Sequence, residues 1–475
     1  MRCLEKGAKV FADLSEINRT KQQLDGSNRS IHSTIVISRV MEGNTTEETD
    51  PDLQVQLILL AASHHNLSSL RPLLRIGSAS VQDSETGFTP LHAAIAACDA
   101  NPDISKTSQE DPTEAAISSG QTNGHTNGVS GGEEESDLEA AVKTVRLLLQ
   151  NGAIWNDVDN NDETPGCLAL RLGLQELYDI MVDAGVRAEM LLSRLDEYEQ
   201  LGDQGDEEEE EDEEANDGNE AVTKGKEEGR VDAEEERVNG HTPNEQHTIG
   251  LIQNDDLDNE DYLQSSLRFQ DGRILDSDNN GVMMAWETDI MKRTAHLLAP
   301  RSDLRILNIG HGMGIIDTFL QEKTPATHHI IEPHPVVLAR MRQDGWYEKA
   351  HITIHEGKWQ DVVPRIMEQG ILFDAIYFDT FAEDYKALRD FFSDCIIGLL
   401  DDGGKWGFFN GMGADRQICY DVYGKIVEMD LFEAGFDTVW ENIEVPEMNK
   451  EEWEGVKRRY WALKVYKLPI CEFIG

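Results

Sequence analysis

The sequence is poor in positive charge and in cysteine. Among 475 residues, Lys and Arg number 42 against 91 Asp and Glu, which gives a formal net charge of -49. Such an excess of negative charge repels nucleic acid and anionic membranes, so we expect a basic protein partner and no direct binding to either. The six cysteines have no C-x-x-C spacing, which argues against a zinc site and a disulfide framework and fits a reducing compartment.

Long hydrophobic runs are also missing. No apolar run approaches the ~18 residues of a membrane span, and the first residues contain no hydrophobic signal core. We therefore expect a soluble, intracellular protein. We also expect it to act as a monomer in the cytoplasm and nucleus. Residues 1–50 are polar and show no sustained period, and residues 201–251 are rich in Glu, Asp and Gly, so we expect a disordered N-terminal segment and a disordered acidic linker.

Two short motifs between these segments indicate a repeat. Residues 87–94 read GFTPLHAA, which resembles the T-P-L-H-x-A signature of ankyrin repeats, and Thr164–Ala169 is a degenerate second copy. The copies are farther apart than one repeat of about 33 residues, so we expect a disordered insertion at about 99–137. Residues 51–200 are therefore predicted to form a small all-α ankyrin-like domain.

The rest of the chain is organised around Leu304–Ile316, an apolar run that breaks into glycines at 310, 312 and 314. This pattern predicts a strand, a tight turn and a helix N-terminus where bare backbone can approach a ligand. Glu332 ends the next strand-like run, 22 residues beyond Gly310, where an acid can accept a ribose hydroxyl. The spacing G-x-G-x-G resembles motif I of class I S-adenosylmethionine-dependent methyltransferases. NAD is the runner-up, because a dinucleotide fingerprint requires glycine at the position where Ile315 stands.

Strand-like and helix-like runs alternate through the C-terminal half. Five strand-like runs precede an expected antiparallel pair at 438–445 and 460–467. Alternation of this kind predicts an α/β fold with a doubly wound sheet. The ending resembles the seven-stranded, Rossmann-like sheet of class I methyltransferases, so residues 252–475 are predicted to form a methyltransferase domain.

Two acidic positions suggest the substrate. Glu287 follows Trp286, and Asp379 ends the fourth strand-like run of the predicted domain. Paired carboxylates match the planar fork of a guanidinium, and fixed positions for a nucleophilic nitrogen and a methyl donor can supply most of the rate of methyl transfer without a metal.

These motifs, with Gly310–Ile315, Glu332–His334 and Trp359-Gln360, resemble guanidinoacetate methyltransferase from about Tyr262 onwards. Together with the ankyrin-like segment and the run Val282–Thr288, they resemble the fungal type IV protein arginine methyltransferase family. That resemblance implies methylation of the delta (N5) nitrogen of arginine in a protein, with a large-subunit ribosomal protein as the substrate class. It also implies S-adenosylmethionine as cofactor, without a metal.

The resemblance assigns roles to individual residues. Glu287 and Asp379 would be catalytic and would hold the guanidino group. The implied cofactor-binding residues are Tyr262, Met291, Gly310, His311, Gly312, Met313, Gly314, Ile315, Glu332, Pro333, His334, Trp359, Gln360 and Asp379. Two other functions stay open: a small-molecule guanidino methyltransferase, and a non-catalytic ankyrin scaffold.

Overall fold

The structure is a computed structural model that describes residues 51–99, 136–203, 259–448, 450–457 and 459–475. The chain divides into two compact units, Met1–Leu177 and Tyr178–Gly475. The expected N-terminal segment, almost all of the expected insertion and almost all of the expected acidic linker lie outside the described residues. Among the helices that the structure describes, none is both long and apolar enough to cross a membrane.

The described part of the N-terminal unit consists of helices. They are α3 (Pro51–Ser63), α4 (Leu67–Leu73), α5 (Pro90–Asp99), α6 (Asp137–Gln150), α7 (Pro165–Arg171) and the start of α8 (Gln175–Asp203). Helix α5 packs against α3, α6 and α7. Its His92 joins the two Thr-Pro motifs, because the ring contacts the Thr89 hydroxyl at 2.9 Å and the Glu163 carbonyl oxygen at 2.9 Å. The predicted helices are present, and their assignment to ankyrin repeats stays a prediction.

The second unit contains a seven-stranded mixed sheet in the order β6-β5-β4-β7-β8-β10-β9. The strands are β4 (Arg305–Ile309), β5 (Thr327–Glu332), β6 (Ile352–Glu356), β7 (Phe373–Phe378), β8 (Leu400–Phe408), β9 (Phe436–Glu444) and β10 (Val465–Phe473). The first five pair in parallel, and β10 is antiparallel to both β8 and β9. The predicted doubly wound sheet with an antiparallel end is confirmed.

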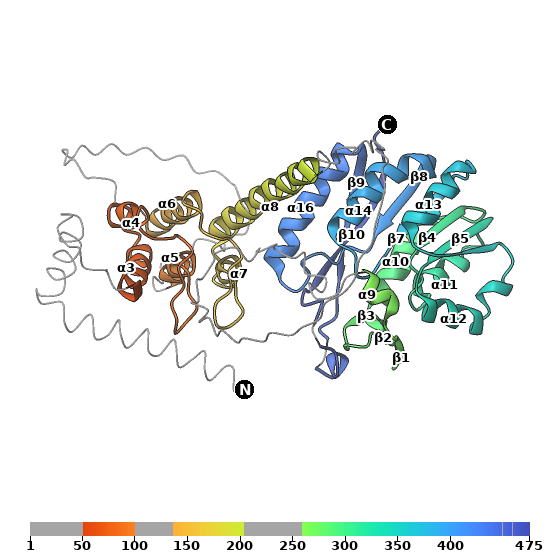
Figure 1. Ribbon diagram of the computed structural model, residues 1–475, viewed down its shortest axis with the longest axis horizontal. Coiled ribbons are helices and arrows are strands. Elements are labelled where there is room, and N and C mark those ends of the chain that lie inside the picture. Colours follow the sequence, from red (N-terminus) through yellow and green to blue (C-terminus); the bar gives the residue numbers. More distant parts are fainter. Residues whose placement is uncertain (1–50, 100–135, 204–258, 449, 458) are drawn as a thin grey trace, which may run out of the picture. The chain divides into compact units, whose positions relative to one another are not determined.

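Strand order reverses between β4 and β7, and the connecting helices follow from this. Helices α11 (Ile315–Gln321) and α12 (Pro335–Gln343) join β4, β5 and β6, whereas α13 (Trp359–Glu368) leads back to β7. Because parallel crossovers are right-handed, the reversal places α11 and α12 on one face and α13 on the other (Figure 1). Ligands of open α/β sheets bind at the carboxyl ends of the strands beside such a reversal.

A small antiparallel sheet precedes the large one. Its strands are β1 (Arg268–Gln270), β2 (Arg273–Leu275) and β3 (Gly281–Met284), and a 3-10 turn, Ala285–Glu287, leads into α10 (Thr288–Leu298). The remaining elements are α9 (Asn259–Gln264), α14 (Tyr385–Asp390), the π-turn Phe391–Cys395, α15 (Ile396–Leu399), α16 (Gln417–Glu433) and the 3-10 turns Trp346–Glu348 and Lys450–Trp453.

The last predicted strand was misplaced by five residues at its start. Strand β10 begins at Val465, and Tyr460 lies in the connection from β9. Tyr460 and Trp461 look like strand residues because they are large and apolar, but their rings pack against Trp286 instead, with centroids 5.9 and 5.4 Å away. The pattern of apolar residues therefore reported burial correctly and secondary structure wrongly at this point.

Candidate active site

The glycine-rich turn joins β4 to α11 and lies against the neighbouring strand β7. Gly310 has φ +93°, and a Cβ there would lie 1.9 Å from the carbonyl oxygen of Asp379. The Asp379 amide in turn donates to the Ile309 carbonyl at 2.9 Å. Only glycine allows this backbone conformation and this close approach, so the turn and the residue that ends β7 are held together.

Glu332 ends β5 beside this turn and is 4% exposed. Its carboxylate accepts from the backbone amides of His311 at 2.9 Å and His334 at 2.8 Å. Burial raises the pKa of Glu332, and the bonds from these amides oppose that rise. A carboxylate has about four acceptor positions, so Glu332 is fixed in place and can still accept hydroxyl groups.

A buried polar cluster supports the turn from behind. Asp317, which is fully buried in α11, contacts the His311 ring nitrogen Nδ1 at 2.6 Å and His328 Nε2 at 2.9 Å, and accepts from the Asn308 amide at 2.9 Å. These partners outweigh burial and lower the pKa of Asp317 to about 2. The cluster keeps a charged carboxylate under the turn and fixes the ring of His311.

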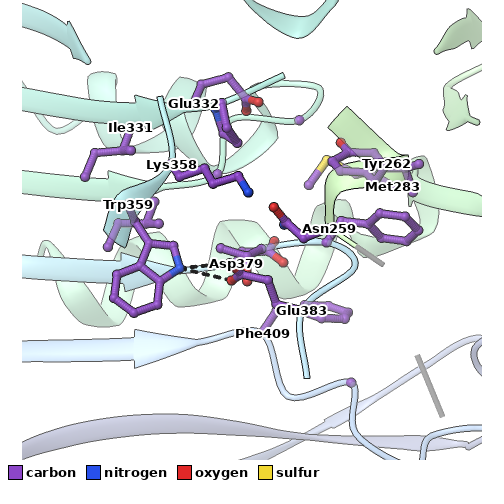
Figure 2. Close-up of a pocket in the computed structure, with 18 of the residues that line it drawn as sticks. Asn259, Tyr262, Met283, Ile331, Glu332, Lys358, Trp359, Asp379, Glu383 and Phe409 are labelled. Atoms are coloured by element: carbon purple, nitrogen blue, oxygen red, sulfur yellow. Dashed lines mark hydrogen bonds between the residues drawn. The ribbon is translucent and has the colours of Figure 1, made fainter. Parts of the chain in front are cut away.

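An aromatic residue forms another wall. Trp359 opens α13, and its indole nitrogen donates to the Glu383 carboxylate at 3.0 Å, as Figure 2 shows. Gln360 donates to the same carboxylate at 2.7 Å. Glu383 belongs to the loop that follows Asp379, so these bonds connect two predicted cofactor-binding residues to the loop that carries a predicted catalytic acid.

Glu287 and Asp379 line one cavity together with Gly310 and Gly312. Glu287 is 3% exposed, and its Oε1 accepts from the Met284 amide at 3.1 Å and from the Tyr460 hydroxyl at 2.5 Å. The two acids stand 92 positions apart in the sequence. They meet because Glu287 ends the turn after β3 while Asp379 follows β7.

The two acids are electrostatically unusual. Burial, and then the charge of Asp379, raise the pKa of Glu287 from its ordinary value of 4.5 to about 8. Burial raises the pKa of Asp379 from 3.8 to about 7. Two carboxylates in one cavity repel each other, and a cation bound between them would favour their ionised forms. Strongly shifted acids in a cleft are typical of functional sites.

Most of the predicted site residues meet at this cavity. Those that line it are Tyr262, Glu287, Gly310, Gly312, Glu332, Pro333, Trp359, Gln360 and Asp379. His311, Met313, Gly314, Ile315 and His334 are not in its lining, although His311 and His334 hold Glu332 through their backbone amides. Met291 is fully buried among core residues and does not line the cavity, so the cavity gives its predicted role no support.

Sequence reasoning missed several residues at the cavity, among them Met283, Glu383 and Tyr460. Met283 accepts a hydrogen bond from the Met313 amide through its sulfur at 3.2 Å, and it faces the cavity from the side opposite Trp359 (Figure 2). Glu383 and Tyr460 also line the cavity. The run Val282–Thr288 drew attention to the segment of Met283, whereas no local pattern marks Glu383 or Tyr460.

The cavity fits an adenosine-bearing cofactor. It combines a fixed acid with spare acceptor capacity, a glycine turn open to close approach, and the apolar surfaces of Trp359 and Ile331. Lys358 is the one basic residue among those that line it. Within the described ranges, no group of three or more His, Cys, Asp or Glu side chains is arranged to hold a metal ion.

Comparisons with known proteins agree with this geometry. Residues 268–466 match the family model of guanidinoacetate N-methyltransferase. A protein of Aspergillus oryzae named protein arginine N-methyltransferase 2 is 54% identical over 90% of this chain and 99% of its own length. A protein of Emericella nidulans with the same name is 52% identical over 91% of this chain and 99% of its own length.

Among solved structures, the N-methyltransferase NodS from Bradyrhizobium japonicum matches 40% of this chain and 95% of its own at 18% identity, with a TM-score of 0.29, and that likeness adds no argument. The matches to the two fungal relatives cover nearly the whole length of each relative and about nine-tenths of this chain. The expectation of a methyltransferase related to guanidinoacetate methyltransferase is confirmed. The chain belongs to the family of fungal proteins named protein arginine N-methyltransferase 2.

Proposed function

We propose that this protein is an enzyme that transfers a methyl group from S-adenosylmethionine to the guanidino group of arginine in a protein substrate. The observation that carries the proposal is the convergence of Glu287 and Asp379 on one cavity beside the glycine turn and Glu332. Membership of a family named for arginine methylation supports the same activity.

The cofactor has a place in this cavity. S-adenosylmethionine supplies a methyl group activated by a positively charged sulfur. Glu332 would accept the ribose hydroxyls, the backbone of Gly310–Gly314 would hold the methionine part, and Trp359 with Gln360 would border the adenine. Every one of these groups lies on a strand end or a helix start, where the fold fixes its position.

Glu287 and Asp379 would hold the substrate. Two carboxylates can bind the guanidinium fork through charge-assisted hydrogen bonds and orient one nitrogen. Their raised pKa values suit a further role, because the nitrogen that gains a methyl group must release a proton. A carboxylate with a pKa near 7 or 8 can accept that proton at neutral pH.

Finer features of the proposal rest on the resemblance to type IV enzymes. They are modification of the delta (N5) nitrogen, a large-subunit ribosomal protein as substrate, action as a monomer and residence in the cytoplasm and nucleus. The net charge of -49 supports a basic protein substrate, since electrostatic attraction favours such an encounter. The N-terminal helical unit would supply a second surface for a macromolecular partner.

The test uses the full chain and isosteric variants. The protein is incubated with methyl-labelled cofactor and ribosomal extract, and modified peptides are fragmented by mass spectrometry to locate the methyl group. Glu287→Gln should remove labelling while retaining cofactor binding, whereas Glu368→Gln, an exposed substitution on α13, should keep full activity. Cofactor binding without any labelled arginine in the wild-type reaction would refute the proposal.

A second candidate is methylation of a small guanidino compound. The match of residues 268–466 to the guanidinoacetate N-methyltransferase model favours it. Guanidinoacetate and an arginine-containing protein would then compete for the same acids. Turnover of guanidinoacetate as fast as that of any protein substrate would decide for the small molecule.

A further inference from the structure

The connection between β9 and β10 brings a tyrosine to the catalytic acid. Its described residues 445–448, 450–457 and 459–464 reach the small sheet, where Arg273 of β2 donates to the carbonyl oxygens of Glu452 at 3.2 Å and Glu454 at 2.9 Å. The Lys457 amide donates to the Asn279 carbonyl at 2.9 Å. We name residues 450–457 and 459–464 the strap.

Tyr460 is the residue of the strap that reaches the cavity. Its ring lies between those of Trp286 and Trp453, with centroid distances of 5.9 and 5.2 Å. A Cβ at Gly281 would lie 2.9 Å from the Tyr460 ring, so the strand β3 passes directly beside it. The ring is therefore held on several sides, and its hydroxyl has a defined direction.

That hydroxyl is the middle of a short hydrogen-bonded chain. The Trp286 indole nitrogen donates to the Tyr460 oxygen at 3.1 Å, and the Tyr460 hydroxyl donates to Glu287 Oε1 at 2.5 Å. A donated hydrogen bond makes a hydroxyl a better donor in turn, because bonds in a chain polarise one another. Burial beside acids raises the pKa of Tyr460 well above its ordinary value, so it keeps the proton that it donates.

The chain fixes which oxygen of Glu287 faces the substrate. Oε1 receives both the Tyr460 hydroxyl and the Met284 amide. Among the described residues, none forms a hydrogen bond with Oε2, while the side chain as a whole lines the cavity. One oxygen is thus used for anchoring, and the other is available to a guanidinium.

We propose that Tyr460 is a positioning residue for the methyl transfer: it anchors Oε1 of Glu287, turns Oε2 toward the substrate and favours the ionised form of the carboxylate. This inference rests on the proposed function for its catalytic consequence. The strap is then part of the substrate site, although it lies 173 residues beyond the acid that it orients.

The test compares Tyr460→Phe with Tyr385→Phe. Both substitutions keep the ring and remove a hydroxyl that donates to a carboxylate. The Tyr385 hydroxyl donates to Asp430 at 2.5 Å, and Asp430 belongs to α16 and not to the cavity lining. A bond to a charged group corresponds to about a ten- to hundredfold effect, so Tyr460→Phe should lower kcat/KM by that factor. Its pH profile should move to higher pH by about one unit, because ionised Glu287 loses a donor. Tyr385→Phe should change neither quantity.

A measurement without turnover separates the two proposals. The midpoint of thermal unfolding is followed against pH for Tyr460→Phe in the wild-type and Glu287→Gln backgrounds. The cost of losing the hydroxyl should grow with pH when Glu287 is present and stay constant when it is replaced. If wild-type protein methylates no arginine but this coupling is found, the proposed function fails and the anchoring of Glu287 stands.

Two results would overturn the role of Tyr460. One is an unchanged pH profile and kcat/KM in a folded Tyr460→Phe variant. The other is a cost that is equal at all pH values in both backgrounds. Should Tyr460→Phe fail to fold, Trp286→Phe removes the indole donor to the same hydroxyl, and a pH profile like that of the wild type would count against the hydrogen-bonded chain.

Discussion

Replacing Glu287 by glutamine should inactivate the enzyme and stabilise its fold. In the native protein the pKa of Glu287 is about 8, so the side chain keeps its proton up to that pH. In the unfolded chain it loses the proton near the ordinary pKa of 4.5. Between these pH values the native state binds more protons, so stability falls as pH rises. The amide of Glu287→Gln can still accept from Tyr460 and Met284, but it carries no charge.

The size of the effect follows from the pKa. A rise from 4.5 to about 8 corresponds to about 5 kcal/mol of lost stability once the pH exceeds 8. About 2 kcal/mol of this is already lost at pH 6, so the advantage of the variant should be roughly 3 kcal/mol larger at pH 9 than at pH 6. In a domain of this size that difference is roughly 6–12 °C in Tm.

The assay is thermal unfolding followed by circular dichroism at both pH values, with methylation measured in parallel. Glu368→Gln, which replaces an exposed acid on α13, is the matched control and should show the same Tm difference as the wild type. The prediction is wrong if the Tm advantage of Glu287→Gln over the wild type does not grow as pH rises. Ionisation of Glu287 would then carry no cost in stability, and its pKa in the folded protein would not be raised.

Further predictions concern the turn, the cluster behind it and the second acid. Gly310→Ala should abolish cofactor binding in calorimetry, because its Cβ would lie 1.9 Å from the Asp379 carbonyl oxygen, whereas Gly403→Ala, at φ +69° in open space, should cost only about 1 kcal/mol and keep binding. Asp317→Asn should lower the free energy of unfolding at neutral pH by about 2 kcal/mol or more, because a pKa of about 2 means that the fold stabilises the charged carboxylate. Denaturant titration measures this free energy. A value equal to that of the wild type would mean that the bond to His311 contributes nothing. The kcat/KM for an arginine substrate should rise with pH through the pKa of Asp379, about 7, and level off once both acids are ionised; a profile flat between pH 6 and pH 9 would contradict their roles.

Much of the fold was predictable because its signals are local. Apolar runs located the parallel strands, and glycines at alternate positions located the turn after β4. Glu332 could be proposed from spacing alone, since one βαβ unit fixes the distance from the turn to the end of the next strand. The start of β10 was misplaced, because apolar rings packed in a loop give the same pattern as a buried strand.

The site was predictable only where its residues belong to a motif. Trp359 and Gln360 were proposed from resemblance, but their shared partner Glu383 was not, because nothing in its neighbourhood distinguishes it from other surface acids. Met291 was proposed for the cofactor and lies in the core instead of the cavity lining. A methionine on an amphipathic helix looks the same in either place, and only packing separates the two.

The sequence by itself determined the class of the sheet and the glycine turn, because periodicity and short-range spacing encode them. It pointed to Glu287 and Asp379 only through the resemblance to a known family. Only the tertiary structure decided that Glu287 and Asp379 share a cavity, that their pKa values rise there, and that Tyr460 anchors one of them. The physical reason is that pKa and side-chain direction depend on what surrounds a residue in space, and strand order brings together neighbours that the linear sequence keeps far apart.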